Sequence, residues 1–164
     1  MSGYKAPLHD MAFVMNDLGV LQTVADLPGH ENLNNELVGT ILETAGRFAG
    51  DVLAPLNHPG DQQGCSINDS MVHTPEGFSE AYRAFAADGW TGLAGSTTHG
   101  GQGLPALVSI AAKEIWASAN MAWSLCPGLS QGAIELLSVH GTEKQKNAYL
   151  PHLISGKWTG TMNL

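Results

Sequence analysis

The chain has 164 residues, 43% of them hydrophobic and 13% charged, which predicts a folded domain with a hydrophobic core and excludes a disordered chain. Its formal net charge at pH 7 is −8, with 7 Lys and Arg residues against 15 Asp and Glu residues. Because a protein that binds nucleic acid needs basic side chains to neutralise phosphates, this balance argues against a nucleic-acid partner.

Helical patterns and turns alternate along the first part of the chain. Residues 1–9 are predicted to form an arm, and Asp10 is a candidate cap for a first helix that the turn at residues 26–29 ends. A second helix is predicted from near Asn32 up to Pro55, which stops it. Apolar side chains recur in this second helix at helical spacing and predict one buried face: Leu37, Ile41, Ala45, Phe48 and Val52.

The middle of the chain is rich in turn-forming residues. Residues 55–74 hold proline and glycine among polar residues, and we expect a loop of about 20 residues there. Thr74 and Pro75 then begin a third helix, which the turn at residues 88–89 ends. Residues 92–103 hold five glycines, and Gly101, Gly103 and Ala106 nominally fit a dinucleotide-binding fingerprint. That motif needs a preceding strand and a βαβ unit, and neither is predicted, so an irregular connection is expected.

The last part of the chain again shows helical signals. One helix is predicted to start at Pro105, and another to restart at Pro127 after a short turn capped by Asn120. Thr142 and Gln145 form a capping box at the start of the last helix, which is the clearest local signal in the chain. The elements together predict an all-α helical bundle of about six helices.

Residues 158–164 change the pattern from helix to strand. Tryptophan and two threonines suit a pleated surface, and Gly160 lets another group approach the backbone closely. We therefore expect a helical domain over residues 1–157 and, over residues 158–164, the first strand of a second, β-structured domain. Because that strand has no partner strand left in the sequence, we expect the chain to be a truncated form of a longer protein.

The sequence shows no self-contained catalytic or metal site. None of the 7 histidines lies three or four residues from another, Ser130 is not in a G-x-S-x-G motif, and Cys126 has no basic residue near it in sequence. Cys65 and Cys126 are too few for a disulfide framework. No signal-peptide pattern is present, and no apolar run reaches the about 18 residues of a membrane span. We therefore expect a cytoplasmic chain without a metal or a membrane span.

Four parts of the chain carry a family resemblance: residues 4–7 (YKAP) followed by 10–13 (DMAF), residues 89–90 (GW) with 99–103 (HGGQG), residues 121–128 (MAWSLCPG) and residues 140–164 (HGTEKQKNAYLPHLISGKWTGTMNL). In order and spacing they resemble the N-terminal helical domain of the acyl-CoA dehydrogenase family, in the branch that includes 3-methylmercaptopropionyl-CoA dehydrogenase. The last stretch is similar to the junction at which that domain passes into the flavin-contacting β-domain.

The resemblance implies an FAD cofactor and two sets of site residues. In the family a strand beginning in this way lies against the flavin, so the expected cofactor-binding residues are Thr161, Met162, Asn163 and Leu164. Residues 121–128 resemble the segment that faces the acyl chain, so the candidate substrate contacts are Trp123, Leu125, Cys126 and Leu129. Ordinary core packing is the alternative role of these four side chains. No catalytic residue is implied, because the family's catalytic glutamate lies in a C-terminal domain that the sequence does not contain.

Two functions remain open from the sequence. The first is the N-terminal part of an FAD-dependent acyl-CoA dehydrogenase, which takes an acyl-CoA substrate, passes electrons to a transfer acceptor and assembles as a homo-oligomer. The second is a stand-alone helical interaction domain that kept the fold without the chemistry. In both cases we expect the 164-residue chain by itself to be inactive and not to retain FAD.

Overall fold

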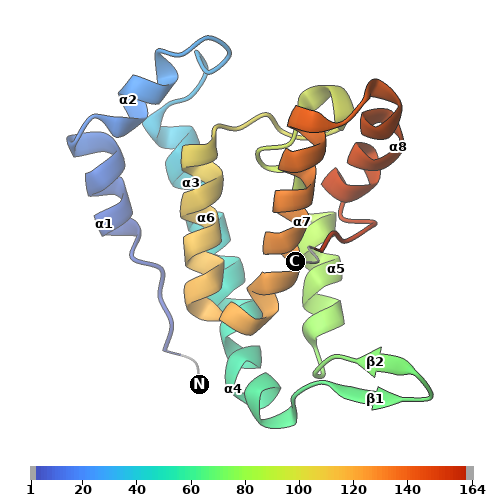
Figure 1. Ribbon diagram of the computed structural model, residues 1–164. Coiled ribbons are helices and arrows are strands. Elements are labelled where there is room, and N and C mark those ends of the chain that lie inside the picture. The colour runs from blue at the N-terminus through green and yellow to red at the C-terminus, as the bar shows by residue number, and fades with distance from the viewer. Residues whose placement is uncertain (1–2, 162–164) are drawn as a thin grey trace.

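Helices make up most of the computed structural model, which describes residues 3–161 (Figure 1). In chain order the α-helices are α1 (Leu8–Ala12), α2 (Val20–Ala25), α3 (Asn35–Phe48), α4 (Ala54–Gln63), α5 (Phe78–Ala87), α6 (Ala106–Ala119), α7 (Met121–His140) and α8 (Glu143–Ile154). Short π-helical turns η1 (Phe13–Asp17) and η2 (Ala49–Leu53) and 3-10 turns η3 (Trp90–Gly92) and η4 (Thr97–His99) connect some of them. The predicted all-α class is confirmed.

The loop predicted over residues 55–74 is wrong, because α4 and a hairpin occupy most of it. The turn η2 joins α3 to α4, and Pro55 lies in the first turn of α4. A proline is tolerated in a first turn, and a π-helical turn accommodates an irregularity in the backbone hydrogen bonds. Pro59 lies inside α4 without ending it. Proline therefore marks a change of helix geometry here, where the sequence suggested a stop.

The hairpin consists of β1 (Ser66–Asn68) and β2 (Met71–His73), which pair in antiparallel register. Asn68 pairs with Met71, so Asp69 and Ser70 form a two-residue turn, with φ values of 49° and 62°. Positive φ at both central positions is the geometry of tight hairpin turns, which glycine usually supplies. The hairpin was missed in the sequence because neither turn residue is glycine.

Asn120 joins α6 to α7. Its side-chain Oδ1 accepts a hydrogen bond from the Trp123 amide at 3.0 Å, and its Nδ2 donates to the Leu53 carbonyl at 3.2 Å. The cap at Asn120 was predicted, but the short turn that it was expected to start is the beginning of α7. This helix continues through Pro127, so the restart predicted at that proline is wrong.

Aromatic side chains form the centre of the main core. The Phe85 ring lies 4.7 Å from the Trp116 ring and 5.2 Å from the Trp123 ring, both edge to face, and 5.8 Å from the Phe48 ring. A separate apolar cluster binds α8 to α7 through Ile134, Leu150, Leu153 and Ile154. The core therefore fixes α3, α5, α6 and α7 together, and α8 is held mainly through α7.

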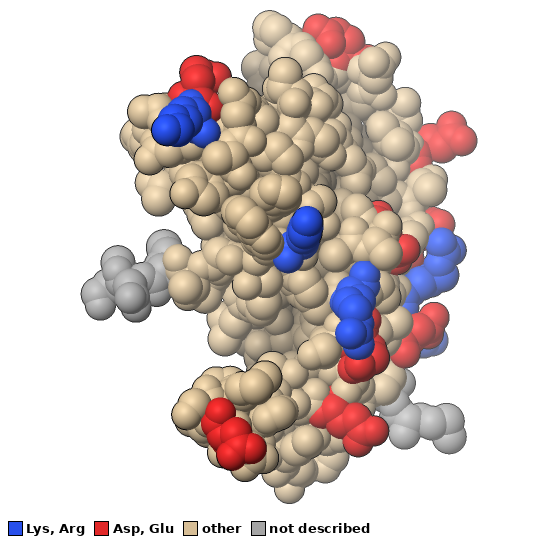
Figure 2. Space-filling view, turned by 90° about the vertical axis from the view of Figure 1, so that its right-hand side faces the viewer, with Lys and Arg blue, Asp and Glu red and all other residues tan. Residues whose placement is uncertain are grey.

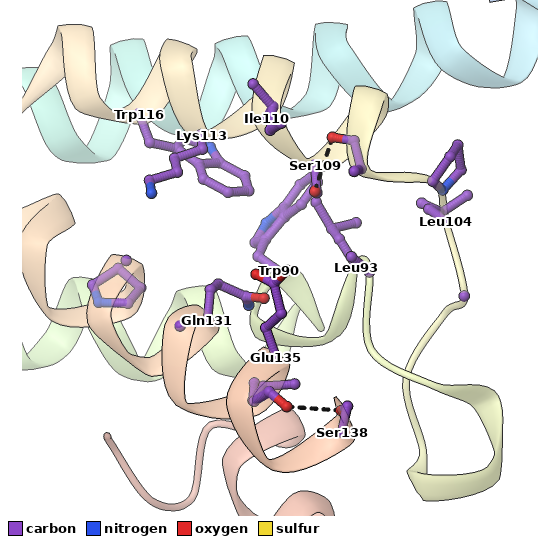
Figure 3. A pocket seen from close by; sticks show the side chains of 18 of the residues that line it. Trp90, Leu93, Leu104, Ser109, Ile110, Lys113, Trp116, Gln131, Glu135 and Ser138 are labelled. Carbon is purple, nitrogen blue, oxygen red and sulfur yellow. Dashed lines mark hydrogen bonds between the residues drawn. The ribbon is translucent and has the colours of Figure 1, made fainter. Parts of the chain in front are cut away.

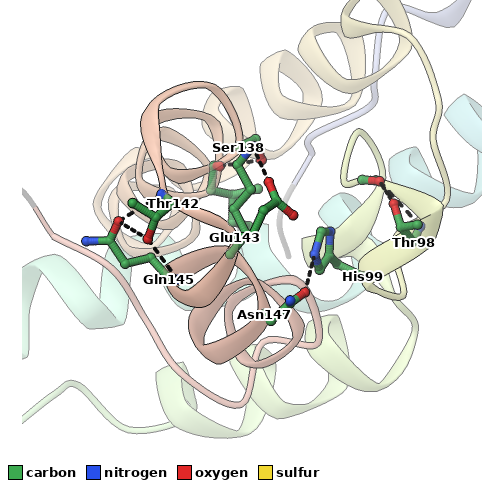
Figure 4. A network of polar contacts seen from close by, with 10 residues as sticks. Thr98, His99, Ser138, Thr142, Glu143, Gln145 and Asn147 are labelled. Carbon is green, nitrogen blue, oxygen red and sulfur yellow. Dashed lines mark hydrogen bonds and ion pairs between the residues drawn. The ribbon is translucent and has the colours of Figure 1, made fainter.

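The capping box at the start of α8 is confirmed (Figure 4). The Gln145 amide donates to Thr142 Oγ1 at 3.3 Å, and the Thr142 amide donates to Gln145 Oε1 at 2.9 Å. Further along α8, Asn147 Oδ1 lies 3.4 Å from His99 Nε2 of η4, so this helix also contacts the glycine-rich connection (Figure 4). That connection is irregular, as predicted.

Residues 158–161 follow α8 without regular secondary structure. The Trp158 amide donates to the His152 carbonyl at 3.0 Å, and its ring lies 4.3 Å from the His152 ring. The predicted strand over residues 158–164 is not formed in this described portion, because no other strand lies beside it to pair with. Residues 162–164 lie outside the described residues, and the division into two domains stays a prediction.

The face that lies on the right of Figure 1, on the side of α8 and the hairpin, carries few charges. Figure 2 shows scattered acidic and basic side chains there, with uncharged surface between them. The described residues include exposed apolar side chains, among them Ile67 and Val72 of the hairpin and Trp158. None of the helices formed by residues 3–161 is long and apolar enough to cross a membrane.

Candidate functional site

A cleft of about 710 Å³ lies between α6 and α7. The two helices meet at Asn120 and diverge from it, and the glycine-rich connection closes the far end with Leu93, Leu104 and Pro105 (Figures 1 and 3). A cavity of this size lies in the range of about 300–1,000 Å³ that small-molecule sites occupy. The cleft is therefore the best candidate site in the described part of the chain.

The floor of the cleft is aromatic. Trp116 comes from α6 and Trp90 from η3, and their rings lie 5.3 Å apart at 70° (Figure 3). Phe85 of α5 supports them from the core side, with its ring against Trp116. Because all three rings are packed into the main core, the floor is rigid and apolar.

Small residues on α7 give the cleft its width. Ser124, Gly128 and Gly132 recur every four residues and line the same wall, which is the spacing of one helix face. A Cβ atom added to Gly128 would lie 3.6 Å from Cε of Lys113, and one added to Gly132 would meet no atom within 4 Å. Larger side chains at these positions would fill the cleft, so its volume depends on this stripe.

Polar side chains lie around the aromatic floor. Figure 3 shows Lys113 of α6 and Gln131 and Glu135 of α7 directed toward the space between the helices. Gln131 Nε2 donates to the Thr91 carbonyl, which fixes its side chain between α7 and η3. The cleft therefore combines an apolar floor with a polar rim, as expected for a site that binds an amphiphilic ligand.

The four predicted substrate contacts occupy different places. Trp123 is 3% exposed, packs against Phe48 and Phe85, and donates its indole N–H to the Phe78 carbonyl at 3.1 Å. It is a core residue, which was the alternative role considered for it, and it does not line the cleft. The remaining predicted contacts lie on the outer faces of α7, with Leu125 and Cys126 exposed and Leu129 half-buried.

Cys126 lies beside Tyr82 of α5. Partial burial of its thiol raises the pKa of Cys126, although the residue as a whole is exposed. Burial also raises the pKa of Tyr82, and the nearby Cys126 adds to the rise. The Tyr82 hydroxyl donates to the Gly156 carbonyl at 3.2 Å. A raised pKa keeps the thiol protonated, which favours a packing role for Cys126 over a nucleophilic one.

The predicted cofactor-binding residues are described only at Thr161, which is exposed. Met162, Asn163 and Leu164 lie outside the described residues. The group that approaches Gly160 is not a cofactor but Ala133 of α7, whose Cβ would lie 2.5 Å from a Cβ added there. The set of four cofactor-binding residues therefore stays a prediction. Residues 3–161 also contain no cluster of three or more metal-ligating side chains.

The signal for the cleft was present in the sequence but was not used. A serine and two glycines at four-residue intervals predict a helix face without bulk, and such a face leaves room beside it. Trp90 and Trp116 were not identified as site residues, because only the folded chain brings η3 next to α6.

Comparison with known proteins supports the same architecture. Residues 38–157 match the family model for the N-terminal domain of acyl-CoA dehydrogenase. The 3-methylmercaptopropionyl-CoA dehydrogenase of Ruegeria pomeroyi is 42% identical over 161 residues, covering 98% of this chain and 27% of that protein. The butyryl-CoA dehydrogenase of Syntrophomonas wolfei is 28% identical over 130 residues, covering 77% of this chain and 21% of that protein.

Solved structures share the fold. Butyryl-CoA dehydrogenase from Megasphaera elsdenii superposes with a TM-score of 0.57 at 24% identity, and a structure described for the electron transferring flavoprotein of Acidaminococcus fermentans with 0.59 at 20% identity. Each covers 74% of this chain and 30% of the other chain. The chain belongs to the acyl-CoA dehydrogenase family and carries its N-terminal domain. It spans about a quarter of the length of the curated relatives that it matches.

Proposed function

We propose that this domain is the N-terminal part of an FAD-dependent acyl-CoA dehydrogenase that forms an α,β double bond in an acyl-CoA thioester. The observation that carries the proposal is the 42% identity to 3-methylmercaptopropionyl-CoA dehydrogenase over nearly the whole chain. By the same analogy, the whole protein works in the cytoplasm, acts on a short acyl chain, assembles as a homo-oligomer and passes its electrons to a separate transfer acceptor.

Within that enzyme we propose that the cleft between α6 and α7 receives the acyl chain. Its apolar floor favours hydrocarbon, its polar rim tolerates a thioester, and the small residues of α7 leave the necessary room. The contacts predicted from the sequence at Leu125, Cys126 and Leu129 do not line this cleft and remain the alternative placement, on the outer faces of α7. The catalytic base and the flavin bed belong to the part of the enzyme that the sequence does not contain.

The proposal is tested by filling the cleft. Gly132→Leu places a bulky side chain in open space on the cleft wall, whereas Gly39→Leu makes the same change at a glycine of α3 that also has no atom within 4 Å. Binding of butyryl-CoA and of free CoA to the chain is measured by calorimetry, and circular dichroism verifies the fold of both variants. We expect Gly132→Leu to weaken butyryl-CoA binding at least about tenfold, because it displaces a buried acyl group.

Free CoA and Gly39→Leu are the controls for this test. Free CoA should bind more weakly than butyryl-CoA, and Gly39→Leu should bind both as the unchanged chain does. Equal loss in the two leucine variants would contradict the placement of the acyl chain in the cleft. Butyryl-CoA binding no tighter than that of free CoA would do the same.

A further inference from the structure

Unpaired buried polar atoms gather at the floor of the cleft. Trp90 Nε1, Trp116 Nε1 and Ser124 Oγ are buried and have no hydrogen-bond partner within residues 3–161. Their residues are 7%, 6% and 6% exposed, and all three line the cleft. Buried polar groups in folded proteins are nearly always paired, so three such atoms at one site require an explanation.

The unpaired state is a local property of the cleft. Among the described residues the same condition occurs at one other atom, His99 Nδ1. The third tryptophan of the core, Trp123, has its indole N–H paired with the Phe78 carbonyl at 3.1 Å. The aromatic core therefore satisfies an indole away from the cleft and leaves two indoles unsatisfied beside it.

Three polar side chains that line the cleft donate to the backbone. Gln131 Nε2 donates to the Thr91 carbonyl, Ser109 Oγ to the Ala106 carbonyl and Ser138 Oγ to the Ile134 carbonyl. Each of these bonds uses a donor, and none of the three side chains is hydrogen-bonded to an indole. No side chain of the described residues, Glu135 of the rim included, accepts from the indole N–H of Trp90 or Trp116, so a molecule in the cleft can supply the missing acceptor.

We infer that the cleft floor selects acyl chains that carry a hydrogen-bond acceptor, preferably an ether or carbonyl oxygen, through the indole N–H groups of Trp90 and Trp116 and the hydroxyl of Ser124. This inference rests on the proposed function, because it assumes that an acyl chain enters the cleft. A plain hydrocarbon chain leaves the donors unpaired, whereas an oxygen in the chain pairs with one of them. A thioether sulfur is a weaker acceptor and should rank between the two.

The test compares thioesters of equal length. In 3-methoxypropionyl-CoA an ether oxygen replaces one methylene of pentanoyl-CoA, and in 3-methylmercaptopropionyl-CoA a sulfur replaces it. Each is titrated into the uniformly ¹⁵N-labelled chain, and the indole N–H resonances are followed and assigned with single Trp→Phe variants. We expect the ether to bind about 3- to 10-fold more tightly than pentanoyl-CoA, and to shift the Trp90 or Trp116 resonance downfield.

Variants locate the effect. Trp116→Phe and Trp90→Phe keep an aromatic ring and remove the donor, and Ser124→Ala removes the hydroxyl at little cost in volume. The first two should reduce the preference for the ether toward unity, with Ser124→Ala having a smaller effect. The control Trp158→Phe changes a tryptophan outside the cleft and should keep the full preference. Thermal unfolding of each variant confirms that it is folded.

Two results would overturn the inference. Equal binding of the ether and pentanoyl-CoA, with the Trp90 and Trp116 resonances unmoved, refutes the selectivity and leaves the proposed acyl site intact. No binding of any thioester refutes both proposals. If a tryptophan variant fails to fold, the resonance shifts and the affinity ratio of the unchanged chain still decide between these outcomes.

Discussion

Asn120→Ala should destabilise the chain far more than the loss of an ordinary helix cap. Asn120 is 1% exposed and makes two hydrogen bonds that connect the start of α7 to η2. An exposed cap contributes about 1 kcal/mol. Here the substitution also removes the bond to the Leu53 carbonyl, worth about 1 kcal/mol, and leaves the buried Trp123 amide unpaired at about 1–3 kcal/mol. We expect a total loss of about 2–4 kcal/mol.

Asn34→Ala provides the matched control. Asn34 caps α3 in the same way, accepting from the Leu37 amide at 2.9 Å, but it is exposed, so water replaces the lost bond. Its substitution should cost about 1 kcal/mol. Urea unfolding followed by circular dichroism and tryptophan fluorescence gives both free energies of unfolding. If Asn120→Ala costs no more than Asn34→Ala, the argument that burial amplifies this cap is refuted.

Three further predictions address the glycines, the thiols and the cofactor. Gly101→Ala should lower the free energy of unfolding by about 1–3 kcal/mol, because its Cβ would lie 2.1 Å from the Gly95 carbonyl oxygen. Gly132→Ala, in an open helical position, should raise the free energy of unfolding by about 0.5–1 kcal/mol. Urea unfolding measures both, and the opposite ranking would contradict the steric argument. Iodoacetamide at pH 8 should modify Cys65 before Cys126, because the raised pKa of Cys126 reduces its thiolate fraction. The labelling rate of Cys126 should still increase above that pH. Mass spectrometry of the labelled peptides measures both rates, and faster labelling of Cys126 would oppose the argument from burial. The purified 164-residue chain should carry no FAD, as measured by absorbance near 450 nm. With added FAD and acyl-CoA, it should reduce no dye above a protein-free control. A yellow protein or sustained turnover would show that the 164-residue chain alone holds the cofactor.

Local signals were predicted well and remote ones were not. The capping box of Thr142 and Gln145 depends on atoms three residues apart, so its sequence pattern was sufficient. Pro55 was read as a stop because a proline's usual effect is local, yet the turn η2 lets the chain remain helical around it. The turn of Asp69 and Ser70 carries no glycine, so pattern alone did not reveal the hairpin.

The candidate site followed the same division. A family resemblance pointed to α7, which forms one wall of the proposed acyl site, but it could not say which side of that helix is open. Trp123 is buried because its ring meets Phe48 and Phe85, and these contacts join parts of the chain far apart in sequence. The aromatic floor of the cleft was not predicted for the same reason, since Trp90 of η3 meets Trp116 of α6 only in the folded chain.

The junction at Asn120 makes α7 a lever. This helix has 20 residues and is about 30 Å long, so a rotation of about 5° around its fixed end moves the other end by about 2–3 Å. The apolar cluster of Ile134, Leu150, Leu153 and Ile154 carries α8 along with it. A molecule that enters the cleft and changes its width will therefore displace α8 and the segment after it most, and the bonds of Asn120 least. A rotation of α7 about Asn120 would in this way move α8 and residues 155–161, which follow it.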